Sequence, residues 1–181
     1  MLTSEARSLS GPYLYTGKLA LVSLLTLVGA CDVMTPTGDL ALPFEGPGWS
    51  DESGITLELE EGQRVFVGAT HLDVKNTNEA QTLFDDRMAK LREVLPEQKG
   101  LIGYSLRQNV FNNDRYMTVS VWRSEEEMLA WVVSDAHSAA IVDFATLGEK
   151  GITTAWEDDV ENVPPAWTDV EARLVDEGRE Y

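Results

Sequence analysis

The order of hydrophobic periodicities between residues 64 and 157 limits the folds that this chain can adopt. Residues 64–75, 101–110, 116–122 and 152–157 have strand patterns, and the stretches after the first and third of them carry apolar residues at helical spacing. The order strand, helix, strand, strand, helix, strand is that of the split βαβ unit. We therefore predict an α+β, ferredoxin-like βαββαβ domain, with both helices on one face of an antiparallel sheet.

Capping residues mark where both helices begin. Asn76 is followed three positions later by Glu79, and Ser124 is followed in the same way by Glu127. In such pairs the first side chain accepts a hydrogen bond from a free N–H of the first turn, and the glutamate reaches back to the cap residue. These pairs predict the two helix starts, and Ser134 predicts a break in the second helix.

The chain is strongly acidic. Its 181 residues include 31 Asp and Glu but only 14 Lys and Arg, which gives a formal net charge of −17. Such a surface repels phosphate backbones and anionic lipid headgroups. We therefore expect no nucleic-acid partner and interpret the acidic surface as solubilising.

A short apolar segment lies near the N-terminus. Residues 19–30 read LALVSLLTLVGA and follow Lys18, and they are too few to span a bilayer as a helix but suit a signal peptide. Cys31 comes next, and the stretch from Val28 to Cys31 resembles a bacterial lipobox. We predict that residues 1–30 are a lipoprotein signal peptide and that Cys31 is lipidated, because a lone cysteine would otherwise stay unpaired in an oxidising compartment.

The predicted anchor also indicates a location. Asp32 resembles the signal that keeps some Gram-negative lipoproteins in the inner membrane. We expect the protein in the cell envelope, attached to the membrane through its lipid, on the periplasmic or extracytoplasmic side of the inner membrane. Residues 31–54 are rich in Pro, Gly and acids and are predicted to be a flexible tether.

Residues 55–160 are predicted to form the folded domain, and residues 161–181 a C-terminal extension. Trp167, Val170 and Leu174 lie at helical spacing in this extension and predict a short helix that clasps the domain or its partner. With helices on one face only, the other apolar face of the sheet needs cover. We therefore predict a homodimer in which two sheets pack face to face as a dimeric α+β barrel.

A family resemblance lies in residues 116–141, which read YMTVSVWRSEEEMLAWVVSDAHSAAI. A strand, a tryptophan, a capped helix with a second tryptophan and a Ser-Asp break resemble the antibiotic biosynthesis monooxygenase superfamily, including its heme-degrading members. The resemblance extends over roughly residues 64–157. It implies the ferredoxin-like fold, the dimeric barrel and a pocket between the helices and the sheet.

The heme-degrading members use an asparagine, a tryptophan and an iron-binding histidine, and the resemblance places Thr70, Trp131 and Ile141 at these positions. Isoleucine cannot bind iron, so we expect weak heme binding or none and no metal site. Other members of the superfamily oxidise aromatic or quinone-like substrates without metal or flavin. The resemblance therefore implies a small aromatic or quinone-like ligand and no cofactor.

The candidate site residues follow from these positions and from strand and helix faces. We predict His137 and Trp131 as catalytic residues. The predicted lining of the substrate pocket is Thr70, Tyr104, Ile141 and Phe144.

Alternatives stand beside each candidate. The alternative for His137 is a core histidine whose ring is hydrogen-bonded to a backbone carbonyl. His71 lies next to Thr70 but on the opposite strand face, so both cannot line one wall. Arg107 is opposite to Tyr104 and is expected either to anchor an anionic substrate or to form an ion pair across the dimer.

Two functions are compatible with the sequence. The first is a monooxygenase that acts on a small aromatic or redox-active molecule, with cofactor-independent chemistry favoured over heme degradation. The second is a non-catalytic binding or structural lipoprotein, such as an accessory subunit of a membrane complex. The sequence contains no nucleotide-binding, zinc-hydrolase or serine-hydrolase motif.

Overall fold

The computed structural model describes residues 33–34, 39–109 and 114–181. The predicted signal peptide and the lipidation site Cys31 lie outside the described residues, and so do residues 110–113.

One seven-stranded sheet runs through the molecule, and all its neighbouring strands are antiparallel. Its spatial order is β1 (Val33–Met34), β2 (Asp39–Ala41), β6 (Leu101–Asn109), β7 (Arg115–Trp122), β5 (Val65–Val74), β8 (Gly148–Asp158) and β9 (Arg179–Glu180). The four long strands, β5 to β8, have the order of a ferredoxin-like sheet, which confirms the predicted fold class. A small hairpin of β3 (Trp49–Ser50) and β4 (Gly54–Ile55) lies apart from this sheet.

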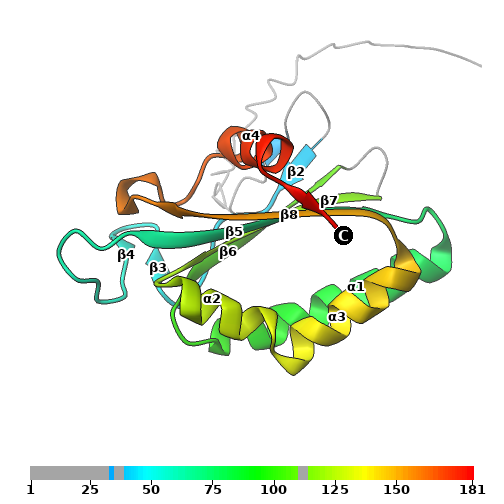
Figure 1. Ribbon diagram of the computed structural model, residues 1–181, viewed down its shortest axis with the longest axis horizontal. Helices are drawn as coiled ribbons and strands as arrows, with labels where there is room; N and C mark the ends of the chain where they lie inside the picture. The colour runs from blue at the N-terminus through cyan, green and yellow to red at the C-terminus, as the bar shows by residue number, and fades with distance from the viewer. Residues whose placement is uncertain (1–32, 35–38, 110–113) are drawn as a thin grey trace, which may run out of the picture.

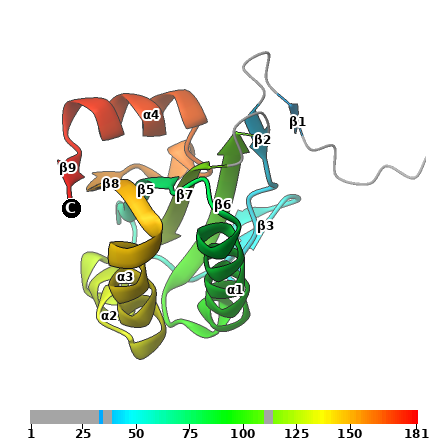
Figure 2. The ribbon, with the colours of Figure 1, turned by 90° about the vertical axis from the view of Figure 1, so that its right-hand side faces the viewer.

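Helices cover both faces of the sheet, as Figures 1 and 2 show. One face carries α1 (Asn78–Val94), α2 (Glu125–Val132) and α3 (Asp135–Leu147), and the other carries α4 (Trp167–Asp176). Short 3-10 turns, η1 (Leu95–Glu97) and η2 (Val160–Asn162), follow α1 and β8. Among the described helices none is by itself long and apolar enough to cross a membrane; α2 and α3, bent by 58°, meet this criterion only as a pair and only by length and composition.

The helix starts follow the predicted capping logic with one correction. Ser124 accepts from the N–H of Glu127 at 3.3 Å, and Ser134 caps α3 in the same way through the N–H of His137. The cap of α1 is Thr77 and not Asn76, because the Thr77 hydroxyl is the group that accepts from the Ala80 N–H. The helix therefore begins one residue later than predicted, and the capped N–H is that of Ala80.

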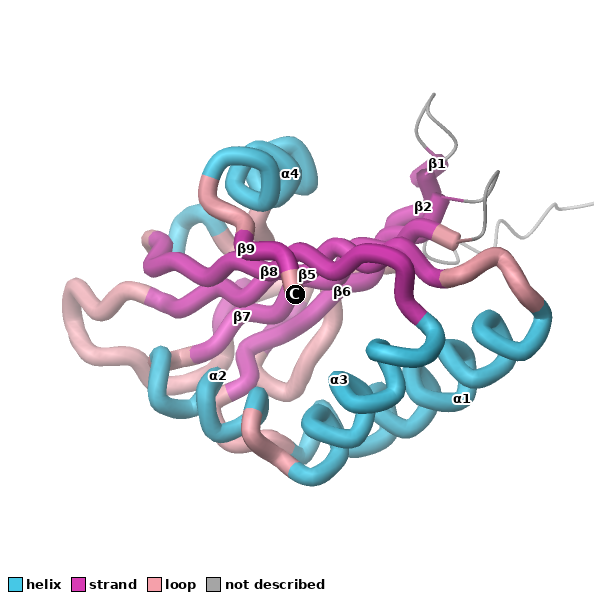
Figure 3. The backbone as a smooth tube through the Cα atoms, turned by 45° about the vertical axis from the view of Figure 1, so that its right-hand side comes forward, coloured by secondary structure: helices cyan, strands magenta, loops and turns pink. Residues whose placement is uncertain are grey.

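The face of the sheet away from α1 to α3 is covered within the chain. Val65, Val67 and Val121 on this face are fully buried, and α4 contributes Val170 and Leu174 to the same cluster. Partly buried residues of the N-terminal segment, among them Phe44 and Leu57, complete it. Figure 3 shows the sheet as a middle layer between α4 and the other helices.

This cover corrects the reason for expecting a homodimer through that face. The apolar surface that was predicted to need a second chain is occupied by α4 and by residues 44–59. Arg107 also has a different role from the two expected for it. It is buried and forms ion pairs with Asp39 of β2 and Glu171 of α4, within the same chain.

The predicted tether is wrong for residues 39–54. Strand β2 pairs with β6, and the following residues continue along the same edge through hydrogen bonds from Leu42 to Leu106 and from Gly48 to Ile102. Close contact is possible because Gly46 lies against the backbone of Gly103, where a Cβ atom would come within 2.4 Å. The Pro- and Gly-rich composition reflects this tight packing on a strand edge rather than flexibility.

Candidate functional site

A cavity of about 470 Å³ lies between the sheet and helices α1, α2 and α3. The apolar side chains of this layer form two separate clusters, one around Phe84 and Tyr116 and the other around Trp122 and Trp131. Both clusters contribute residues to the cavity wall. The cavity exists because the core on this face is divided, and its volume lies in the range of small-molecule sites.

The floor of the cavity is made of small and hydroxyl-bearing residues on the sheet. Two cross-strand rows supply them, and the paired positions are Ser120, Gly68 and Ala155 in one row and Thr118, Thr70 and Thr153 in the other. Short side chains at these positions leave the space above the sheet open. The floor is therefore flat and carries hydroxyl groups.

The floor hydroxyls differ in what they already bind. Thr153 donates to the Ala69 carbonyl at 3.0 Å, and Ser120 accepts from the Trp122 indole N–H at 2.9 Å. The Thr118 hydroxyl makes no hydrogen bond to a described residue. It is a free donor and acceptor at the centre of the floor.

Trp131 and His137 form part of the opposite wall. The Trp131 side chain is 7% exposed, and the ring centroids of Trp131 and His137 are 5.1 Å apart. The break between α2 and α3 makes this contact possible, because Ser134 ends one helix and caps the next, so that His137 turns back toward the end of α2. The wall is thus an aromatic surface with one ionisable ring.

Two features define the state of His137. Its Nδ1 lies 3.2 Å from the Val132 carbonyl, which can only accept, so Nδ1 carries the proton and Nε2 is left with its lone pair. Burial lowers the pKa of His137, although the bond to Val132 acts in the opposite direction. Nε2 has no partner among the described residues. The ring is therefore a neutral base on the cavity wall at neutral pH.

Polar groups also lie where α1 and β6 approach each other. Burial and a hydrogen bond to the Glu45 carboxylate raise the pKa of Tyr104, so its hydroxyl stays protonated. Arg92 lies 3.7 Å from the same carboxylate. Further along α1, Arg87 forms an ion pair with Asp143 of α3. The cavity lining thus includes a neutral phenol and two guanidinium groups, each already paired with a carboxylate.

All six predicted site residues border this one cavity. They are Thr70, Tyr104, Trp131, His137, Ile141 and Phe144. His71 and Arg107 lie elsewhere, since His71 bonds to Asp73 and Arg107 faces α4. His137 was predicted either as a site residue or as a core histidine bonded to a carbonyl. The structure combines the two, because its ring bonds to a carbonyl and also lines the cavity.

Sequence reasoning missed several lining residues. Thr118 and Ser120 were open to prediction, because they alternate along β7 on the same face as Tyr104 on β6. Arg92 lies on α1, and an arginine on a helix surface does not by itself indicate a position in a ligand site. Tyr181 also lines the cavity, although it is far from the other residues in sequence, and no local pattern indicates this position.

The lining lacks the iron ligand at the position that the family resemblance implies. Ile141 stands there, and its side chain has no ligand atom. Among the described residues no group of three or more His, Cys, Asp or Glu side chains could hold a metal ion.

Comparison with known families agrees with this geometry. The family model of the antibiotic biosynthesis monooxygenases matches residues 71–142. By this match, residues 71–142 resemble an antibiotic biosynthesis monooxygenase (ABM) domain. The matched residues of this ABM domain include Tyr104, Trp131 and His137, whereas Thr70, Phe144 and Tyr181 lie outside the match.

Individual proteins similar to the ABM domain come from several bacteria. The "42.8 kDa protein in whiE locus" of Streptomyces coelicolor is 29% identical over 97 residues, which cover 54% of this chain and only 24% of that protein. Similar solved structures include a proposed antibiotic biosynthesis monooxygenase from Nitrosomonas europaea, at 12% identity and a TM-score of 0.47 over 56% of this chain and 95% of that one. Another is SnoaB, a cofactor-independent oxygenase from Streptomyces nogalater, at 11% identity and a TM-score of 0.44 over 56% and 98%.

Proposed function

We propose that the ABM domain binds a small, flat aromatic or quinone-like molecule in the cavity and oxidises it with dioxygen, without a resident cofactor. The observation that carries this proposal is the state of His137, a neutral ring with a free Nε2 on the wall of an apolar cavity. The aromatic wall of Trp131 and the flat floor support a planar ligand.

The proposed reaction begins with a proton transfer. A methylene group made acidic by a neighbouring aromatic ring and carbonyl gives a proton to His137 Nε2, and the electron pair spreads over the ring system. The carbanion then passes electrons to dioxygen and a C–O bond forms. The O–O bond breaks, the CH₂ group becomes C=O, and the second oxygen leaves as water with both hydrogens. One O₂ is consumed for each carbonyl formed.

Donors on the cavity lining support the anionic intermediate. The Thr118 hydroxyl is free of described partners and can donate to the anion. The guanidinium groups of Arg87 and Arg92 also border the cavity. Such donors stabilise an oxyanion best where water is excluded. The cavity offers this environment between the two apolar clusters.

Oxygen uptake tests the proposal. Anthrone, which has a methylene group between aromatic rings, is added to the protein, and an oxygen electrode measures consumption above the rate in buffer. We expect turnover in the wild type and a loss of at least about a hundredfold in His137→Gln, because the variant lacks a base. The rate should stay flat from neutral pH down through the ordinary histidine pKa of 6.5 and fall only at lower pH, since protonation removes the lone pair and burial lowers the pKa of His137.

The matched control is His71→Gln, which changes the other histidine of the chain. His71 bonds to Asp73 and does not line the cavity, so its variant should keep the wild-type rate. Equal rates in both variants would contradict the role of His137. Binding of anthrone without oxygen consumption would favour the alternative, a non-catalytic binding lipoprotein.

We further propose that Cys31 carries a lipid that anchors the domain at the outer face of the inner membrane. The support is the sequence alone, namely the apolar residues 19–30 and the small residues before the cysteine. Expressed in a Gram-negative host, the wild type should fractionate with membranes, and Cys31→Ala should lose its acyl chains and leave the membrane fraction. Mass spectrometry of the N-terminal peptide checks this, and an unmodified mature Cys31 would contradict it.

A further inference from the structure

The segment after β8 contacts both faces of the sheet. It leaves β8 at Asp158, crosses the far face as α4, and returns to the sheet edge as β9 beside β8. Tyr181 follows β9 and lines the cavity on the opposite face from α4. The position of Tyr181 therefore depends on how this whole segment docks.

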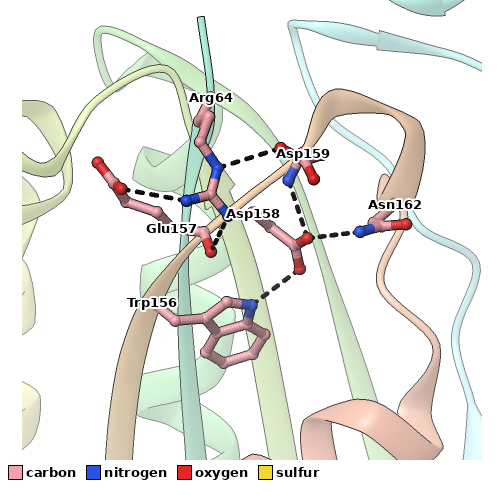
Figure 4. Close-up of polar contacts among 6 residues, drawn as sticks. All are labelled: Arg64, Trp156, Glu157, Asp158, Asp159 and Asn162. Atoms are coloured by element: carbon pink, nitrogen blue, oxygen red, sulfur yellow. Dashed lines mark hydrogen bonds and ion pairs between the residues drawn. The ribbon is translucent and has the colours of Figure 1, made fainter.

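A compact turn directs the chain from β8 toward α4 (Figure 4). The carboxylate of Asp158 accepts from the Trp156 indole at 2.9 Å, from the Asp159 N–H at 2.9 Å and from the Asn162 amide at 2.6 Å. Arg64 at the start of the neighbouring strand bonds to Glu157 and Asp159. These contacts define the direction in which the segment leaves the sheet.

Helix α4 is held on the far face by apolar and ionic contacts. Val170 and Leu174 are 0% and 5% exposed. The guanidinium of Arg173 lies over the Trp156 ring at 5.1 Å. Glu171 reaches the buried Arg107. The end of the helix also touches the sheet edge closely, because Gly178 leaves no room for a Cβ atom against Ile152.

The last step places an aromatic ring at the cavity. The Tyr181 N–H donates to the Gly151 carbonyl at 3.0 Å, which brings its ring beside Phe144, with centroids 5.6 Å apart. Two glycines of β8 make space for these rings. A Cβ atom on Gly151 would lie 2.6 Å from the Tyr181 ring, and one on Gly148 would lie 2.3 Å from the Phe144 ring.

We propose that Tyr181, positioned by the docking of α4 and β9, forms one end of the ligand cavity and limits the length of ligand that fits. This inference rests on the proposed function, because it concerns the same cavity. About half of Tyr181 is exposed, so it borders the opening rather than the core. Burial of its phenol nevertheless raises its pKa to about 12, so the side chain remains neutral beside the apolar ligand.

Removing the ring should affect short and long ligands differently. A two-ring ligand that ends against Tyr181 loses an aromatic contact and binds more weakly. A three-ring ligand gains the space that the phenol occupied and binds as well as before or better. The ratio of the two affinities reports on the end of the cavity that Tyr181 forms. A general loss of folded protein does not change this ratio.

The test uses two probes, 1,4-naphthoquinone with two fused rings and 9,10-anthraquinone-2-sulfonate with three. Binding is followed by quenching of tryptophan fluorescence, since Trp131 lines the cavity. In Tyr181→Ala we expect the affinity ratio to shift about fivefold toward the longer probe. Tyr181→Phe keeps the ring and should behave as the wild type.

A second variant reaches the same ring from a different residue. Gly151→Ala places a methyl group against the far end of the Tyr181 side chain, which can swing away, and should shift the ratio in the same direction as Tyr181→Ala. Unchanged ratios in both variants, with normal binding by the wild type, would overturn the role of Tyr181 and leave the proposed ligand site standing. Failure of the wild type to bind either probe would overturn both.

Discussion

At the scale of single residues, His137 satisfies two conditions that usually exclude each other. A buried histidine needs a hydrogen-bond partner, and a catalytic base needs a free nitrogen. The two ring nitrogens divide these tasks, with Nδ1 at the Val132 carbonyl and Nε2 left at the cavity. The helix break at Ser134 is what brings Val132 and His137 close enough for this division.

Asp158 is a residue whose ionisation state should affect stability at low pH. Burial acts to raise its pKa, but hydrogen bonds from Asn162, Trp156 and the Asp159 N–H, together with Arg173, outweigh burial and lower it. A carboxyl whose pKa is lower in the folded state stabilises the fold above its ordinary value of 3.8, and this contribution disappears as the pH falls through the folded-state pKa.

We therefore expect Asp158→Asn to lower the free energy of unfolding by about 1 kcal/mol at pH 7, as for the loss of charge-assisted hydrogen bonds at a partly exposed site. The difference from the wild type should shrink below pH 4. Urea unfolding at pH 7 and pH 3 measures both values. Asp159→Asn is the control, since its exposed pair with Arg64 contributes little. Equal destabilisation at both pH values would contradict this account.

At the scale of elements, β5 shows how one strand serves two purposes. Val65, Val67 and Ala69 face the core under α4, whereas Gly68 and Thr70 face the helices and form part of the cavity floor. The alternation was visible in the sequence. The sequence did not show that one of these faces would line a cavity. Small residues on a strand face leave a cavity only if the helices above them do not fill the space.

The N-terminal segment shows the opposite case. Residues 39–54 belong to the predicted tether, yet they add β2 to the sheet, and together with residues 55–59 they cover part of its far face. Their hydrogen bonds go to β6, about sixty residues away, so no local pattern could reveal them. Glycines in this segment suggested a flexible chain. In the structure a glycine such as Gly46 instead allows close backbone contact.

At the scale of the whole molecule, the internal cover of the sheet decides what the protein needs from a partner. With the apolar face buried by α4 and the N-terminal segment, we expect the soluble Cys31→Ala protein, expressed as residues 31–181, to have the mass of one chain by light scattering. A stable dimer at micromolar concentration would contradict this expectation.

A pair of variants on α4 sharpens this test. Leu174→Asp places a charge in the buried contact with the sheet and should loosen α4, so that the variant is less stable and associates through the exposed face. Val175→Asp, one residue later and 83% exposed, should remain a monomer of wild-type stability.

The sequence by itself determined the ferredoxin-like element order, the capped start of α2, the break before α3, the C-terminal helix and six residues that border one cavity. These features follow from the spacing of apolar residues and from local hydrogen bonds, which involve residues close together in the sequence. Only the tertiary structure decided that α4 covers the far face, that residues 39–54 join the sheet, and that Tyr181 closes one end of the cavity. Each of these depends on contacts between distant segments, where burial of apolar surface favours whichever part of the chain reaches it.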